Sequence, residues 1–262
     1  MAELAPIQTE AARAPTSATG GMGAAAAGCS DGLVSVPHYG GSVNPADAND
    51  PRTRIVNMIP AGSRVLDIGC GSGTISGYLA QVEGCRILAV EPDAIMADEA
   101  RRLGIAVVHA SIEDPAAQAD LASRGPFDAI IFADVLEHLR DPWAVLRAVR
   151  PWLAPNGAVL ASVPNVAYWS IRLALLLGRW DYTDGYLMDR THLRWFTRET
   201  LRRLFVETGF QVIEIQTRWT AFPGDTIWRR LIPGRERLYA ALAQRWPGLF
   251  GYQFVVRAGI AP

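Results

Sequence analysis

Short apolar runs alternate with segments of helical periodicity along most of the chain after residue 63. Bounded apolar runs are typical of buried strands, and an apolar position every three to four residues is typical of a helix. We expect strands over 64–68, 86–90, 105–109, 127–132, 158–163, 211–217 and 252–257. We expect helices over 74–82, 93–103, 115–123, 142–152, 198–208 and 235–246. This alternation predicts an α/β fold, with a doubly wound and mostly parallel sheet.

Three segments depart from this alternation. Residues 1–35 are rich in Ala, Gly, Thr and Ser, and we interpret them as a disordered tail before a single domain over 36–262. Residues 164–197 and 219–248 interrupt the alternation as insertions. The first insertion contains the apolar stretch 167–180, in which Arg172 and Arg179 stand one heptad apart on one face. We predict that this stretch forms an amphipathic helix that acts as a lid.

Charge and cysteine content narrow the class of protein. The formal net charge is −1, so no global basic field favours a nucleic acid as partner. No apolar run is long enough for a transmembrane helix, and weak contact of the 167–180 segment with a membrane surface is the alternative to a lid. Three cysteines cannot form a paired disulfide framework, which predicts a reduced, cytoplasmic location.

The first predicted strand leads into glycines at alternate positions, Gly69, Gly71 and Gly73, before a helix begins. A strand, glycine turn and helix in this order bring backbone amides close to a ligand. The acid Asp67 before the turn suits a ligand with a positive ammonium group better than a pyrophosphate. The nicotinamide fingerprint G-x-G-x-x-G needs a glycine where this chain has Thr74, so an NAD-dependent oxidoreductase is the less favoured alternative.

The stretch from Asp67 to Gly73 resembles motif I of the class I S-adenosylmethionine-dependent methyltransferases, (D/E)-x-G-x-G-x-G. The resemblance implies a Rossmann-like sheet with an antiparallel last strand, S-adenosylmethionine as cofactor and methyl transfer as the reaction. Glu91, at the end of the second predicted strand, would accept the ribose hydroxyls. The cofactor-binding residues that the resemblance implies are Asp67, Gly69, Gly71, Gly73, Glu91, Ser111, Ile112 and Ala133.

A second resemblance concerns the residues from Asp134 to Leu139, which are similar to the D-x-L-E-H-L segment of a bacterial branch of this family. That branch includes polysaccharide, secondary-metabolite and quinone O-methyltransferases. A hydroxyl acceptor needs a general base or a metal ion to lower its pKa, and His138 and His192 are the candidate catalytic bases. As the alternative, the set Asp134, Glu137, His138 and His192 resembles a divalent-metal site, with Asp134 shorter than the Glu usual there.

We therefore expect an S-adenosylmethionine-dependent methyltransferase that acts on a small molecule or glycan, with O-methylation of a hydroxyl preferred. Besides the oxidoreductase, two alternatives stay open. One is an N-methyltransferase of a small-molecule amine. The other is a catalytically silent module that binds the cofactor and acts as a partner or regulator.

Overall fold

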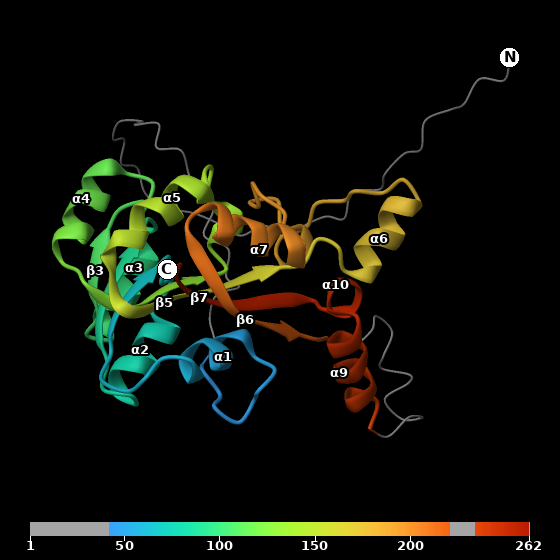
Figure 1. Cartoon of the computed structure of the whole chain (residues 1–262), viewed down its shortest axis with the longest axis horizontal. Coiled ribbons are helices and arrows are strands. Elements are labelled where there is room, and N and C mark those ends of the chain that lie inside the picture. The colour runs from blue at the N-terminus through green and yellow to red at the C-terminus, as the bar shows by residue number, and fades with distance from the viewer. Residues whose placement is uncertain (1–41, 221–233, 262) are drawn as a thin grey trace, which may run out of the picture. The chain divides into compact units, whose positions relative to one another are not determined.

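Seven strands form one sheet in the order β3-β2-β1-β4-β5-β7-β6 in the computed structural model, which describes residues 42–220 and 234–261 (Figure 1). Strands β1 to β5 run parallel, and β7 lies antiparallel between β5 and β6. The strands are β1 Arg64–Ile68, β2 Arg86–Glu91, β3 Ala106–His109, β4 Phe127–Ala133, β5 Leu153–Pro164, β6 Phe210–Arg218 and β7 Gln253–Ile260. The predicted Rossmann-like sheet with its antiparallel last strand is confirmed.

The middle of the sheet is covered on both faces, which explains why its strands are almost entirely apolar. In β4, Ile130 and Phe132 pack in the larger core cluster, and Ile131 packs in a second cluster on the other face. Successive side chains of a strand point to opposite faces, so an unbroken apolar run supplies both cores. Full burial of such a side chain stabilises the fold by about 1.5–3 kcal/mol.

Helices cover both faces of the sheet. Ile55 and Leu79 bring α1 and α2 into the second cluster, whereas Leu121, Leu146 and Leu204 bring α4, α5 and α7 into the larger one. The helices are α1 Pro51–Asn57, α2 Thr74–Gln81, α3 Ala94–Arg102, α4 Pro115–Ser123, α5 Pro142–Val149, α6 Trp169–Leu176, α7 Arg198–Glu207, α9 Arg235–Arg245 and α10 Pro247–Phe250. Short 3₁₀ helices are η1 Leu136–His138, η2 Arg150–Trp152 and η3 Tyr186–Met188.

Three helices begin at an aspartate that is followed by proline. Asp50, Asp114 and Asp141 each accept a hydrogen bond from a backbone N–H in the first turn of α1, α4 and α5. The proline has no N–H of its own to leave unsatisfied, and its fixed φ suits the first helical position. These caps fix where the loops after β3 and β4 end, and both loops belong to the edge of the sheet that carries the candidate site.

The helix in the insertion after β5 is shorter than the predicted 167–180 helix. It ends before Gly178, whose φ of +73° is the left-handed conformation that commonly terminates helices. Arg179 therefore leaves the helix and pairs with a neighbouring aspartate, so the expected shared face of Arg172 and Arg179 is wrong. No residue of α6 is fully buried, but Trp169 and Ile171 are partly buried against the small cluster of Tyr168, Leu187 and Met188, so part of the helix packs on the protein.

Two predicted segments reach outside the described residues: the tail over 1–35 and part of the insertion over 219–248. Within the described part of that insertion, α9 confirms the helix predicted over 235–246. In the described ranges, every helix is too short or too polar to cross a bilayer.

Candidate active site

The three alternate glycines after β1 all adopt left-handed backbone conformations, with φ of +69°, +55° and +85°. A Cβ added to Gly69 would lie 2.6 Å from Cγ2 of Val135, and one added to Gly73 would lie 3.0 Å from Cβ of Ala100. A larger residue at either position would therefore clash with these neighbouring atoms. A Cβ at Gly71 would meet nothing within 4 Å, so a ligand can approach the backbone closely on this side.

Glu91 closes the glycine turn from the end of β2. Its Oε2 accepts a hydrogen bond from Gly71 N at 2.8 Å, and its Oε1 accepts one from Asp93 N at 2.9 Å. Each carboxylate oxygen keeps a second lone pair, so the group can still accept hydrogen bonds from ligand hydroxyls. Burial raises the pKa of Glu91, which is 7% exposed, while the two backbone donors oppose that rise.

Asp67 is buried in β1, just before the turn. Its Oδ2 accepts a hydrogen bond from Ser76 Oγ of α2 at 2.6 Å. Burial raises the pKa of Asp67 to about 6, and the hydrogen bond from Ser76 offsets part of that rise. The side chain thus links β1 to α2, and its predicted contact with a cofactor ammonium stays a prediction.

The other predicted cofactor residues follow β3 or end β4. Ser111 is exposed, and its Oγ accepts a hydrogen bond from Glu113 N. Ile112 is 5% exposed and packs in the larger core cluster. Ala133 is half-buried at the last position of β4. The carboxyl ends of parallel strands share one edge of a sheet, so these positions and the glycine turn stand at the same edge. Their individual roles stay predictions.

The segment after β4 lies directly against the glycine turn, because Val135 is the residue that a Cβ at Gly69 would strike. The same segment is tied to the insertion after β5. The backbone oxygen of Glu137 accepts hydrogen bonds from Leu193 N at 2.8 Å and Arg194 N at 2.9 Å. The η1 turn is therefore held between the glycine turn and the end of the insertion.

The two predicted catalytic histidines come together at this point and contact each other edge to face. Nδ1 of His138 lies 3.3 Å from the carbonyl oxygen of Thr191, which can only accept, so we assign the proton to Nδ1 and leave Nε2 as an acceptor. Burial lowers the pKa of His138. Burial and the neighbouring His138 lower the pKa of His192 to about 4. Both imidazoles are therefore neutral near neutral pH.

Glu137 completes a cluster of three side chains that can bind a metal, and their ligand atoms lie within 4.8 Å of one another. Oε2 of Glu137 and Nδ1 of His192 are buried without a hydrogen-bond partner among the described residues. Burial and the charge of Asp134 raise the pKa of Glu137 well above its usual range. One carboxylate and two neutral imidazoles suit Zn²⁺ or Mn²⁺. A cation would satisfy both orphaned atoms, so these residues fit a divalent metal.

Asp134 does not join this cluster. Its Oδ1 accepts a hydrogen bond from Ser162 Oγ at 2.8 Å and another from Nε2 of Gln253, which directs the carboxylate toward β5 and β7. Its φ of +56° is uncommon for a residue with a side chain. The predicted four-residue metal set therefore loses Asp134. Ser162 of β5 and Gln253 of β7 were not predicted as partners of Asp134, although each is a polar residue in a mostly apolar strand.

Comparison with known proteins agrees with this geometry. The profile of a methyltransferase domain family matches residues 44–215. A ubiquinone biosynthesis O-methyltransferase of Xanthomonas axonopodis pv. citri is 35% identical over 139 residues, which are 51% of this chain and 55% of the relative. Its counterpart in Xanthomonas euvesicatoria pv. vesicatoria is 34% identical over 138 residues, 50% of this chain and 55% of the relative. The chain thus spans about half the length of the curated relatives it matches.

Solved structures share the fold. A methyltransferase from Thermotoga maritima, described as a possible histamine N-methyltransferase, aligns with a TM-score of 0.53 at 18% identity, over 81% of this chain and 88% of that chain. A putative S-adenosylmethionine-dependent methyltransferase from Listeria monocytogenes aligns with a TM-score of 0.55 at 16% identity, over 82% and 98%. At such identities the likeness shows the fold alone. Because the family profile covers most of its length, the chain belongs to the methyltransferase domain family, and its resemblance to the class I S-adenosylmethionine-dependent methyltransferases is confirmed.

Proposed function

We propose that this protein transfers the methyl group of S-adenosylmethionine to a hydroxyl group of a small molecule or glycan. The observation that carries the proposal is the cluster of Glu137, His138 and His192 beside the glycine turn. Neutral imidazoles next to a cofactor-binding turn would take the proton that a hydroxyl must lose during O-methylation. Family membership favours methyl transfer over the NAD-dependent oxidoreductase.

S-adenosylmethionine brings an activated methyl group, and the chain has to place that group in line with the attacking oxygen. Glu91 would accept the ribose hydroxyls with the lone pairs that its backbone donors leave free. Asp67 would face the ammonium group of the methionine part, where its negative charge is favoured. The remaining cofactor contacts would come from Gly69, Gly71, Gly73, Ser111, Ile112 and Ala133.

His138 is the residue that we assign as general base. Its Nδ1 proton is held by the carbonyl of Thr191, so the lone pair on Nε2 can accept the proton of the acceptor hydroxyl. His192 is a weaker base, since burial and His138 lower its pKa to about 4. We assign His192 to positioning the ring of His138 through their edge-to-face contact.

A divalent cation is the second way in which the same cluster can serve this reaction. Glu137, His138 and His192 would hold it. When bound, such an ion lowers the pKa of a coordinated hydroxyl. His138 cannot bind the cation and take a proton with the same lone pair, so the two roles exclude each other and a metal-free assay separates them.

The acceptor class is argued from relatives and from charge. The Xanthomonas relatives are named O-methyltransferases of ubiquinone biosynthesis, which supports oxygen over nitrogen as the methylated atom. An N-methyltransferase of a small-molecule amine is the alternative, because a neutral amine attacks without a base. The formal net charge of −1 gives no support for a nucleic acid as acceptor.

Contact with a membrane surface is part of the proposal only through the region of α6. Leu173, Leu176 and Leu177 are 47%, 83% and 67% exposed there, and grouped exposed leucines are typical of a docking or lipid-facing surface. The same segment would serve as the lid over the acceptor. The free thiols of Cys70 and Cys85 support a reducing compartment such as the cytoplasm.

The test is transfer of labelled methyl from S-adenosylmethionine into a fractionated bacterial extract by metal-stripped protein, with and without added Mg²⁺ or Mn²⁺. Label in a small-molecule or glycan fraction, in a product that carries a methyl ether, supports the proposal. Label on nitrogen supports the amine alternative. Cofactor binding without label in any fraction contradicts the proposal and favours a silent cofactor-binding module.

A further inference from the structure

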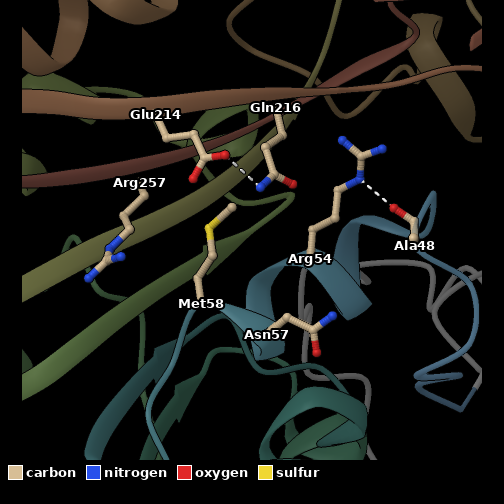
Figure 2. A pocket seen from close by; sticks show the side chains of 7 residues that line it. All are labelled: Ala48, Arg54, Asn57, Met58, Glu214, Gln216 and Arg257. Atoms are coloured by element: carbon tan, nitrogen blue, oxygen red, sulfur yellow. Dashed lines mark hydrogen bonds between the residues drawn. The ribbon is translucent and has the colours of Figure 1, made fainter.

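A cavity of about 390 Å³ lies between α1 and the edge of the sheet formed by β6 and β7 (Figure 2). Its lining is mostly polar, and the residues that matter here are Arg54, Asn57, Met58, Glu214, Gln216 and Arg257. The cavity is set back from the carboxyl ends of the parallel strands, which carry the candidate active site. Arg257 pairs with Leu160 of β5, whereas Ala133, at the end of β4, pairs with Ser162, two residues further along β5.

A β-bulge directs the side chains of β6 into this cavity. Val212 pairs with Ala258 and Glu214 pairs with Arg257, so Ile213 is an extra residue on β6. In a regular strand Glu214 would share the face of Val212, which packs on the larger core. The bulge moves Glu214 to the opposite face, toward α1, and bulges often re-aim side chains near functional sites.

The cavity contains two arginines, and the charges of Asp47 and Glu214 stabilise the cation of Arg54 from a distance. In residues 42–220 and 234–261, no salt bridge forms at Arg54 or Arg257. Nε of Arg257 is buried without a partner in the same ranges. Arg54 is held at the rim by a hydrogen bond from its Nε to the Ala48 carbonyl, and burial lowers its pKa. In the view of Figure 2 the two guanidinium groups flank Met58.

The remaining lining offers partners for hydroxyl groups. Glu214 is oriented by Gln216, whose Nε2 donates to its carboxylate at 2.8 Å, and further lone pairs of that carboxylate stay available. Asn57 adds an amide on the opposite wall. A ligand that satisfies all of these groups carries an anionic group for the arginines and hydroxyl donors for Glu214.

We propose that this cavity is a second ligand site, separate from the methyl-transfer site, that binds a small hydroxylated anion. A sugar phosphate and a hydroxy acid share that chemistry. The cavity is large enough for a ligand of this size, and arginine is suited to both phosphate and carboxylate. The site does not depend on the methyl acceptor, since none of its residues belongs to the cluster of Glu137, His138 and His192.

The experiment is calorimetric titration of the full chain with ribose 5-phosphate, gluconate and ribose. We expect binding of ribose 5-phosphate or of gluconate and none of ribose. Binding of the phosphate alone or of the carboxylate alone identifies the anion. Arg257→Gln and Arg54→Gln should each weaken that binding at least tenfold, while affinity for S-adenosylhomocysteine stays unchanged and reports an intact fold.

The matched control is Arg147→Gln, which removes the same charge from an exposed position of α5. Glu214→Gln should reduce the preference for ribose 5-phosphate over inorganic phosphate, because it weakens acceptance of hydroxyl protons. The proposal is overturned if neither anion binds, or if Arg147→Gln weakens binding as much as Arg257→Gln. Methyl transfer is not measured, so failure of the proposed reaction would leave this result unaffected.

Discussion

His138 and His192 stand edge to face, with ring centroids 4.8 Å apart and 71° between the ring planes. One ring comes from the 3₁₀ turn after β4, and the other comes from the insertion after β5. Two imidazolium cations at this distance would repel each other, so protonation of one ring disfavours protonation of the other. Burial lowers the pKa of both rings, so the pair is neutral near neutral pH, in the form that can accept either a proton or a metal ion.

Replacing His138 by alanine should lower kcat by about 10²–10⁴ while leaving the affinity for S-adenosylmethionine unchanged, since a general base typically contributes that much. His192→Ala should cost less, because His192 acts through His138. The measurement is single-turnover methyl transfer together with cofactor titration. His109→Ala is the control, as this exposed histidine at the end of β3 lies outside the cluster and its Nε2 pairs with the Pro92 carbonyl. An equal loss of kcat in His109→Ala would contradict the assignment of His138 as the general base.

If the cluster of Glu137, His138 and His192 serves the reaction as a metal site, metal-stripped protein should bind one Mn²⁺ ion, as measured by calorimetry. Glu137→Gln and His192→Ala should weaken this binding by at least about tenfold, because each removes a ligand of a three-ligand site. Asp134→Asn should leave the affinity unchanged, because the Asp134 carboxylate is occupied by Ser162 and Gln253. Loss of Mn²⁺ binding in the Asp134→Asn variant would show that Asp134 is a fourth metal ligand, as the sequence predicted. No binding by the unaltered chain would leave His138 as a metal-free base.

Gly71→Val should abolish binding of S-adenosylhomocysteine, because its side chain would fill the open side of the glycine turn. Gly104→Val is a matched control. Gly104 has φ of +83° and also has nothing within 4 Å of an added Cβ, but it lies in the turn after α3. Each substitution costs stability by about 1–2 kcal/mol for the left-handed backbone. Equal loss of cofactor binding in both variants would point to misfolding, and normal binding in Gly71→Val would refute the assigned cofactor turn.

Glu91→Ala should weaken cofactor binding by about 1.5–3 kcal/mol, the usual worth of hydrogen bonds to a charged group. The variant loses both the ribose acceptor and the bond that holds Gly71 N. Calorimetry with S-adenosylhomocysteine and with methionine separates these effects. Methionine has no ribose, so its binding reports only the turn. If both ligands bind Glu91→Ala normally, the assignment fails.

Asp67 should make the fold less stable as pH rises from about 4 to about 6. Its pKa is near 3.8 when unfolded and about 6 when folded, so the stability it contributes is complete below the lower value and is lost through the higher one. A difference of two units corresponds to about 3 kcal/mol. Asp67→Asn should therefore unfold at higher denaturant concentration near pH 7.5 but not at pH 3.5. If the stability of Asp67→Asn depended on pH as the stability of the unaltered protein does, the raised pKa of the buried Asp67 carboxylate would be contradicted.

Most of the sheet could be predicted because its signals are local. Apolar runs such as the one around Ile131 and the glycines after β1 depend on neighbours in sequence. The polar cluster was predictable only in part. His138 and Glu137 belong to the same sequence motif. The approach of His192 depends instead on the insertion, because the backbone N–H groups of Leu193 and Arg194 donate hydrogen bonds to the carbonyl oxygen of Glu137.

The position of Asp134 was not predictable, because it depends on a left-handed φ and on Gln253 from the last strand. The length of α6 was predicted wrongly, since the predicted helix ran through Gly178, whose left-handed φ ends the helix. The polar cavity was missed for a different reason. A single extra residue, Ile213, reverses the faces of β6 from that point on, and a period-of-two pattern read from sequence has no way to register the shift.

The contact between Gly69 and Val135 makes two parts of the molecule inseparable for protein engineering. A chimera that imports the cofactor turn from one homologue and the segment after β4 from another must match the volumes at these two positions. A larger residue at either one forces the turns apart, and a smaller one at 135 leaves a void. Acceptor specificity is therefore best exchanged downstream of Val135, where the graft does not cross this border.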